Sequence, residues 1–229
     1  MEKNIIYMDN AATTRVFPEV LDAMKPYFLE SFGNGSSVYQ FGVKAKNAIE
    51  EARSTIASVI NAKTEEIYFT GGGSESDNWA LKSIADVYKS KGNHIITSKI
   101  EHHAILHTCE WLEKHGCEIT YLDVDEYGMI NPEKLKAAIR EDTILISIMT
   151  ANNEIGTIQP IEEIGKIAHE NGILFHTDAV QAFGHIDIDV EKMHIDLLSA
   201  SSHKINGPKG VGFLYVNKKV KLAPFIHGG

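Results

Sequence analysis

The feature that most constrains the fold is a regular alternation of short apolar runs and amphipathic segments along residues 67–216. The apolar runs are short and lie between turn-forming residues, which favours buried strands, and the segments between them have helical spacing. Parallel strands need a crossover connection, usually a helix. The sequence therefore predicts an α/β fold, with a mostly parallel sheet covered by helices on both faces in an α/β/α sandwich. The expected strands are Ile67–Thr70, His94–Ser98, Glu118–Leu122, Leu145–Met149, Ile173–Thr177 and Asp196–Ser199, with a further strand, Val211–Val216, antiparallel at one end.

The expected helices follow from apolar residues that recur at helical spacing. They are Pro18–Leu29, Val43–Ile60, Ser74–Lys89, His103–His115, Pro132–Arg140 and Ile161–Asn171. In the long second helix we expect a buried stripe made of Ala45, Ala48, Ile49, Ala52, Ile56, Val59 and Ile60.

Composition excludes several classes of function. The 229-residue chain has a net charge of −9 and no basic stripe, so we expect no nucleic-acid partner. No apolar run is long enough to span a bilayer, and residues 1–8 are too short and too charged for a signal peptide, so we expect no membrane partner. The two cysteines, Cys109 and Cys117, have no disulfide-framework or metal spacing, which fits a reducing compartment. We expect a soluble cytoplasmic protein.

Ligands of open α/β sheets bind at the carboxyl ends of the strands, so the residues after each expected strand are the candidates for a site. After the strand that ends at Ser199, small hydroxyl residues such as Ser201 are followed by His203, Lys204 and a Gly-Pro turn. A lysine partly removed from water has a lowered pKa and can form a Schiff base with a carbonyl cofactor. The alternative is a surface lysine beside a turn.

The stretch after the first expected strand is rich in glycine. Residues 70–74 read Thr-Gly-Gly-Gly-Ser, and Ser74 with Asp77 predicts a start to the next helix that resembles a capping box. Free amide groups at a helix N-terminus bind phosphate, whereas the alternative is an ordinary glycine-rich turn. The spacing matches neither a P-loop nor a dinucleotide fingerprint.

Histidines follow the second expected strand. An imidazole of the sequence Glu101-His102-His103 could stack on a flat cofactor ring, or be only a helix cap or a surface side chain. His103 and His107 lie one helical turn apart, but no third ligand stands at a plausible spacing, so we expect no metal site.

Two further strand ends carry polar side chains. Asn152 and Asn153 are either turn formers or hydrogen-bond donors to a ligand. Asp178 either caps the next helix or keeps a pyridine nitrogen protonated. A phosphate cradle, an imidazole, a carboxylate and an amine together are the set that pyridoxal 5′-phosphate (PLP) requires.

Six segments together resemble the NifS/IscS-type cysteine desulfurases of the class V aminotransferase superfamily, which are fold-type I PLP enzymes. The resemblance runs along essentially the whole chain. The segments are residues 7–14, 70–78, 101–104, 152–156, 176–181 and 201–210, the last reading Ser-Ser-His-Lys-Ile-Asn-Gly-Pro-Lys-Gly.

The resemblance implies roles for individual residues. Lys204 is similar to the Schiff-base lysine, Asp178 to the partner of the pyridine nitrogen, and His102 to the histidine that stacks on the ring and relays protons. Lys204 and His102 are thus the expected catalytic residues. The expected cofactor contacts are Gly73, Ser74, His102, Asn153, Asp178, Gln181, Ser201, His203 and Lys204.

The resemblance also implies a reaction and partners. The family removes sulfur from L-cysteine, leaving L-alanine and an enzyme-bound persulfide for iron–sulfur cluster or thio-RNA assembly. We accordingly expect a homodimer that passes sulfur to an acceptor or iron–sulfur scaffold protein. Two alternatives are a non-catalytic PLP-binding or interaction protein and a selenocysteine lyase or other class V aminotransferase-like enzyme.

The chain departs from the family pattern in length. Residues 1–14 are expected to associate with the small domain and residues 15–229 to form the PLP-binding large domain, with the C-terminal small domain missing. In the family, the persulfide-forming cysteine, a substrate-binding arginine and a phosphate-binding threonine from the other subunit lie beyond the position of Gly229. Neither Cys109 nor Cys117 matches that cysteine, so we expect a partial fragment that is inactive on cysteine.

Overall fold

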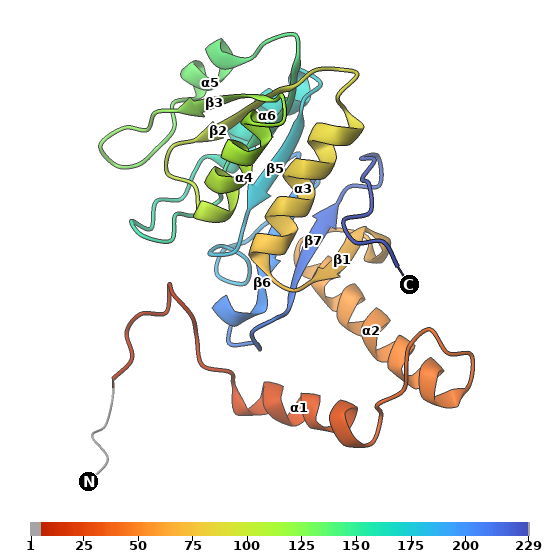
Figure 1. Ribbon diagram of the computed structural model, residues 1–229. Helices are drawn as coiled ribbons and strands as arrows, with labels where there is room; N and C mark the ends of the chain where they lie inside the picture. The colour runs from red at the N-terminus through yellow and green to blue at the C-terminus, as the bar shows by residue number, and fades with distance from the viewer. Residues whose placement is uncertain (1–5, 229) are drawn as a thin grey trace.

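The computed structural model describes residues 6–228 and places seven strands in one sheet between layers of helices (Figure 1). The strand order is β1-β7-β6-β5-β4-β2-β3. The strands are β1 (Ile67–Thr70), β2 (His94–Ser98), β3 (Glu118–Leu122), β4 (Thr143–Ser147), β5 (Leu174–Asp178), β6 (Leu197–Ser201) and β7 (Gly212–Val216). The predicted α/β sandwich with a mostly parallel sheet is confirmed.

The direction of each strand follows from the connection that precedes it. β2 to β6 pair in parallel, whereas β7 is antiparallel to both β6 and β1. Residues 202–211 join β6 to β7 without a crossover helix, and a connection of this kind returns the chain antiparallel. The antiparallel strand was predicted at one end of the sheet, and it lies one position inside that end because β1 forms the edge.

The pleat of the sheet sends successive side chains to opposite faces, and this creates two apolar cores. Ile96, Ile146 and Leu198 belong to one core, and their neighbours Ile95, Leu145 and Leu197 to the other. β2, β4, β6 and β7 are buried along their whole length, as strands covered on both faces must be.

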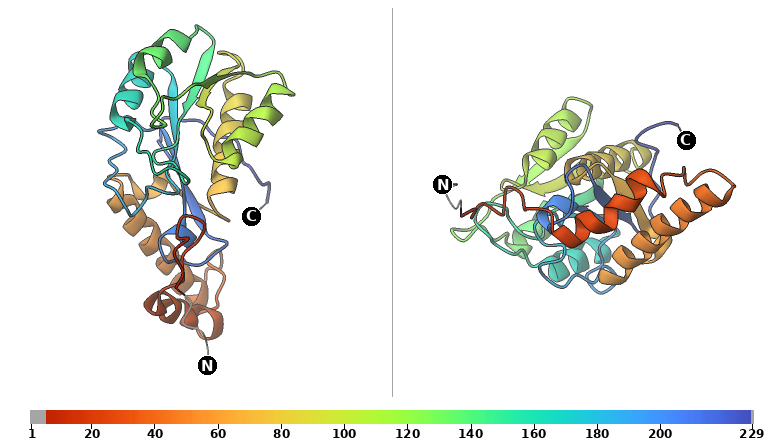
Figure 2. Two further views of the ribbon diagram at one scale, coloured as in Figure 1. Left: turned by 90° about the vertical axis from the view of Figure 1, so that its left-hand side faces the viewer. Right: turned by 90° about the horizontal axis from the view of Figure 1, so that it is seen from below.

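The helices divide between the two faces (Figure 2). α3 and α4 supply apolar side chains to one core, and α5, α6 and the last turn of α2 supply them to the other. The helices are α1 (Pro18–Leu29), α2 (Gln40–Val59), α3 (Gly73–Val87), α4 (His103–Glu113), α5 (Pro132–Ala138) and α6 (Ile161–Glu170).

Residues 17–59, which we call the α1–α2 arm, project from the sandwich formed by residues 61–220 (Figure 1). The predicted buried stripe of α2 is wrong at Ile49, Ala52 and Val59, which are exposed. The reason is that only the end of α2 reaches the sheet, where Ala57 and Ile60 are buried. The middle of the helix faces an open apolar groove.

The N-terminal segment lies against the loop that carries the candidate lysine. The Thr14 N–H donates to the His203 carbonyl at 2.9 Å, and the Phe17 N–H to the Asn206 carbonyl at 3.0 Å. Residues 1–5 of the predicted small-domain segment lie outside the described residues, and the boundary after Thr14 stays a prediction. None of the helices within residues 6–228 is both long and apolar enough to cross a bilayer.

Candidate active site

One cavity of about 370 Å³ lies at the carboxyl edge of the sheet. It is lined by all nine residues predicted to contact the cofactor, together with Ala11, Ala12, Asp77, Met149 and Val180. β1, β2, β4, β5 and β6 run in the same direction, so the residues that follow them meet at this edge. The structure thus brings the predicted residues together, while the role of each stays a prediction.

Lys204 ends a single 3-10 turn, Ser202–Lys204, directly after β6. Its Nζ donates to the carbonyl of Ala11 and, at 2.9 Å, to that of Ala12. Partial burial lowers the pKa of Lys204, although the negative charges of Asp178 and Asp9 oppose this shift. The amine is therefore held inside the cavity and loses its proton more readily than a surface lysine.

The start of α3 lies at the cavity, where the phosphate cradle was predicted, but it lacks the predicted capping box. Gly72, at φ 148°, is the N-cap and offers no side-chain cap, and Ser74 and Asp77 lie inside the helix. A side chain at Gly73 would place Cβ 2.5 Å from Val180 Cγ2, so only glycine lets the backbone lie this close. Gly73 and Ser74 line the cavity at this helix start, which has no side-chain cap, and an uncapped helix N-terminus favours binding of an anion.

A second hollow of about 440 Å³ adjoins the cavity beside this helix start. It shares Gly73, Ser74 and His203 with the cavity and adds Lys209 from the turn after β6. Burial lowers the pKa of His203, and the positive charges of Lys204 and Lys209 add to the effect. Lys209 was missed among the site residues, although it belongs to the segment on which the family resemblance was based.

Asp178 is the last residue of β5 and is buried. Its Oδ1 accepts from the Val180 N–H at 2.9 Å. Burial raises the pKa of Asp178, whereas this hydrogen bond and the positive charge of Lys204 oppose the rise. Gln181, one turn further, donates from Nε2 to the Ala11 carbonyl at 2.9 Å.

His102 is the N-cap of α4, as one of the two sequence interpretations expected. Its Nδ1 accepts from the Ala104 N–H at 3.1 Å. A neutral imidazole that accepts at Nδ1 carries its proton on Nε2. His102 therefore both caps the helix and lines the cavity, so the two interpretations are compatible.

The paired asparagines have different surroundings. Asn152 forms the turn, because its Oδ1 accepts from the Glu154 and Ile155 amides and its Nδ2 donates to the Ile100 carbonyl. Asn153 lines the cavity. The structure thus shows that the first asparagine holds the loop and that the second lines the cavity, while a ligand contact by Asn153 stays a prediction.

Glu101 fixes the loop that carries His102. Its carboxylate accepts from the Ser98 hydroxyl at 2.6 Å and from the Met149 amide at 3.0 Å. Burial raises the pKa of Glu101 to about 8. This buried carboxyl group ties the end of β2 to the end of β4, and sequence reasoning quoted it only as part of a motif.

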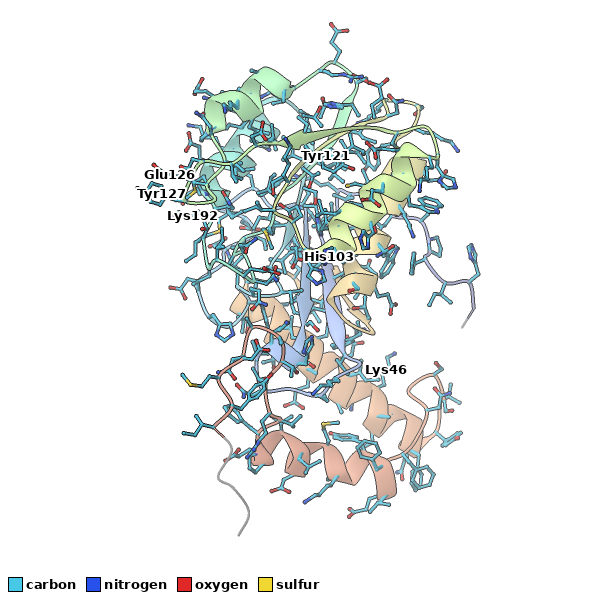
Figure 3. The ribbon with its side chains drawn as sticks, turned by 60° about the vertical axis from the view of Figure 1, so that its left-hand side comes forward. Lys46, His103, Tyr121, Glu126, Tyr127 and Lys192 are labelled. Atoms are coloured by element: carbon cyan, nitrogen blue, oxygen red, sulfur yellow. The ribbon has the colours of Figure 1, made fainter. Side chains whose placement is uncertain are left out.

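Other candidate side chains lie outside the cavity. His103, labelled in Figure 3, and His107 have ring centroids 5.1 Å apart and line a neighbouring hollow. Within residues 6–228 no group of three or more potential metal ligands comes together. Cys109 is buried in the core. Burial raises the pKa of the Cys109 thiol and of the Cys117 thiol. No described cysteine lines the cavity.

The fold matches the large domain of fold-type I PLP enzymes. A family model described as aminotransferase class-V matches residues 6–229, so the chain belongs to the class V aminotransferase family. Within it, the chain is 62% identical over 228 residues to a protein named cysteine desulfurase IscS from Methanosarcina thermophila, which covers 100% of this chain and 56% of that protein. It is 60% identical over 224 residues to a cysteine desulfurase IscS from Clostridium botulinum (strain Kyoto / Type A2), with coverage of 98% and 56%.

Two solved structures superpose closely on this chain. One, described as SspA in complex with cysteine, has a TM-score of 0.96 at 48% identity and covers 98% of this chain and 65% of that one. Another, described as a NifS-like protein, has a TM-score of 0.95 at 43% identity, with coverage of 98% and 62%. The chain spans about 56% of the length of the two curated relatives.

Proposed function

We propose that the cavity binds PLP and that the chain acts in removing sulfur from L-cysteine, which yields L-alanine and a persulfide. One observation carries the proposal: the cavity that gathers Lys204, Asp178, His102 and the uncapped start of α3 belongs to a chain that superposes on a cysteine-bound relative with a TM-score of 0.96. That relative's ligand suggests the amino-acid class of the substrate.

The residues present fit PLP. The start of α3, with Ser201 and His203 beside it, offers donors to a phosphate group, and Lys209 adds a positive charge. Asp178 offers a buried carboxylate, and Lys204 an amine with a lowered pKa. When bound, PLP would act as an electron sink that weakens bonds at the α-carbon of an amino acid.

The chain's own groups would hold and move protons. Asp178 would hold a proton on the pyridine nitrogen, and Asn153 and Gln181 would hydrogen-bond the ring's phenolic oxygen. Lys204 would supply the amine that holds the cofactor, and the Ala11 and Ala12 carbonyls position that amine in this structure. His102 would stack on the ring and donate from Nε2 while its Nδ1 remains in the helix cap.

Sulfur transfer needs an acceptor thiol, and the described residues place none at the cavity. We propose that the acceptor comes from outside residues 6–228. In the family pattern, this thiol would be the persulfide-forming cysteine, which lies beyond the position of Gly229. A homodimer in the cytoplasm would then pass the persulfide sulfur to an acceptor or iron–sulfur scaffold protein.

A visible absorption titration with PLP tests cofactor binding. We expect an absorption band of the lysine-bound cofactor in the wild type and its complete loss in Lys204→Ala. Lys46→Ala, which removes an exposed lysine of α2 (Figure 3), is the matched control and should keep the band. A wild-type chain without the band would contradict the proposal.

The reaction is tested by adding amino acids to the PLP-loaded chain. L-Cysteine should change the spectrum at lower concentration than L-serine or L-alanine. Alanine formation should stay at the level of Lys204→Ala until an external thiol is supplied. The missing thiol also supports a second candidate, a non-catalytic PLP-binding protein, which predicts no alanine even with the thiol. Faster alanine formation from selenocysteine than from cysteine would favour a selenocysteine lyase.

A further inference from the structure

Asp77 is a buried carboxyl group that the proposed mechanism does not use. It lies on the inner face of α3, is 1% exposed, and lines the cavity with Asp178. Its Oδ1 is buried and has no hydrogen-bond partner in the described part of the chain. An ionised carboxylate in such surroundings loses its hydration without replacement, so its charged form is strongly disfavoured.

The nearest basic group cannot neutralise a charge on Asp77. His176 Nε2 lies 3.6 Å from Asp77 Oδ1, but both ring nitrogens are occupied by hydroxyl groups: Nδ1 by Ser147 at 2.9 Å and Nε2 by Ser199 at 3.0 Å. His176 is fully buried, and this burial lowers its pKa to about 3. The imidazole is neutral at physiological pH, and the contact is not an ion pair.

Asp77 and Asp178 have different surroundings, and the difference favours a proton on Asp77. Asp178 accepts a hydrogen bond from the Val180 amide and lies near the positive charge of Lys204. Among residues 6–228, neither a backbone amide nor a positively charged side chain stabilises an ionised Asp77 in this way. Burial, followed by the negative charge of Asp178, raises the pKa of Asp77; the Ser199 hydroxyl opposes the rise, and Glu101 adds to it. When two nearby carboxyl groups compete for one charge, the better-solvated group ionises first.

We propose that Asp77 is a positioning residue that carries a proton and so leaves Asp178 as the ionised carboxylate at the cavity floor. The floor then presents one negative charge, which matches the single positive charge of a protonated pyridine nitrogen. Only this last match rests on the proposed function. The proton on Asp77 is a property of the chain without cofactor.

Carboxyl ¹³C NMR of the aspartate-labelled chain without PLP tests the protonation state. Asp77→Asn identifies the resonance by its loss, and Asp86→Asn, on the exposed face of the same helix, is the matched control. We expect the lost resonance to have the chemical shift of a protonated carboxyl at neutral pH. A shift typical of an ionised carboxylate at neutral pH would overturn the proposal. If Asp77→Asn does not fold, Asp77→Ser makes the same assignment.

The pH dependence of unfolding provides an independent test. The folded chain keeps the Asp77 proton, whereas an unfolded aspartate releases it above about pH 4, so folding must take up a proton as the pH rises. Asp77→Asn removes this requirement. We expect its Tm relative to wild type to increase between about pH 5 and about pH 8, while the Asp86→Asn difference stays flat. A difference for Asp77→Asn that is flat or shrinks would overturn the proposal.

These outcomes are distinguishable from failure of the proposed function. If PLP does not bind but Asp77 is protonated, the proposed function fails and the inference stands. If PLP binds and Asp77 is ionised, the reverse holds. If PLP binds, its affinity measured against pH should show one ionisation fewer above neutral pH in Asp77→Asn than in wild type. Identical pH profiles for the two chains would count against the positioning role.

Discussion

The sandwich and the α1–α2 arm have similar amphipathic sequences but opposite degrees of burial. In the sandwich, four strands are buried along their whole length. In the arm, α1 has no buried residue, and Phe28 and Leu29 are 69% and 80% exposed. Hydrophobic spacing predicts which face of a helix is apolar, but not whether another part of the same chain covers that face.

The exposed faces of the arm border a groove of about 750 Å³. Its lining includes Tyr27, Phe32, Ile49, Phe69 and Val211. A contiguous apolar surface of this kind is typical of a contact surface rather than of a free monomer. The sandwich is therefore stabilised by its own packing, whereas the arm leaves part of its apolar surface exposed to solvent.

The largest difference between the sandwich and the α1–α2 arm should appear in the free energy of unfolding when a leucine is replaced by alanine. Leu81→Ala, at a fully buried position of α3, is expected to lower the free energy of unfolding by about 2–5 kcal/mol because it leaves a cavity. Leu29→Ala, at the end of α1, should change it by less than about 0.5 kcal/mol. Denaturant unfolding of both variants measures the contrast, and equal losses would show that the arm is packed in solution.

A second prediction concerns the buried carboxyl of Glu101. Its pKa is about 8 in the folded chain and near 4 in an unfolded one, so the folded state keeps a proton that the unfolded state releases. Stability is therefore lost as pH rises from about 4 to about 8. Glu101→Gln should lose less stability across this window than wild type, as measured by Tm against pH. Glu110→Gln, at an exposed position of α4, is the control, and a slope for Glu101→Gln that equals that of wild type would refute the assignment.

Substitutions in the α1–α2 arm should have the smallest effect on folding. They should nevertheless change the self-association of the chain. We expect the chain to self-associate or to be poorly soluble because apolar surface is exposed. Phe28→Glu should shift the chain toward monomer in sedimentation or size-exclusion measurements and leave the Tm nearly unchanged. Lys25→Glu, on the same helix, controls for the added negative charge. Well-behaved monomers of the wild-type chain would contradict this prediction.

Local sequence predicted the features that depend on neighbouring residues. The strands were predicted from apolar runs. The nine expected cofactor contacts came from the family resemblance, and the structure gathers them around one cavity. The end of β4 was predicted two residues late, at Met149 instead of Ser147. Such ends depend on pairing with neighbouring strands rather than on composition.

Features that depend on distant parts of the chain were missed. The contacts of Lys204 with Ala11 and Ala12 join residues 193 and 192 positions apart. The missing partner of Asp77 depends on what α3 packs against, so composition could not reveal it. The uncovered stripe of α2 was missed for the same reason.

The attachment of residues 11–17 to the loop at residues 203–206 has a consequence for the order of folding during synthesis. Thr14 and His203 are 189 residues apart, yet Thr14 Oγ1 donates to the His203 carbonyl. At a synthesis rate of roughly 5–20 residues per second, the ribosome needs about 10–40 s after making Thr14 before His203 exists. Residues 11–17 therefore reach their place only after residues 203–206 have been made, and the Lys204 side of the cavity is completed only then.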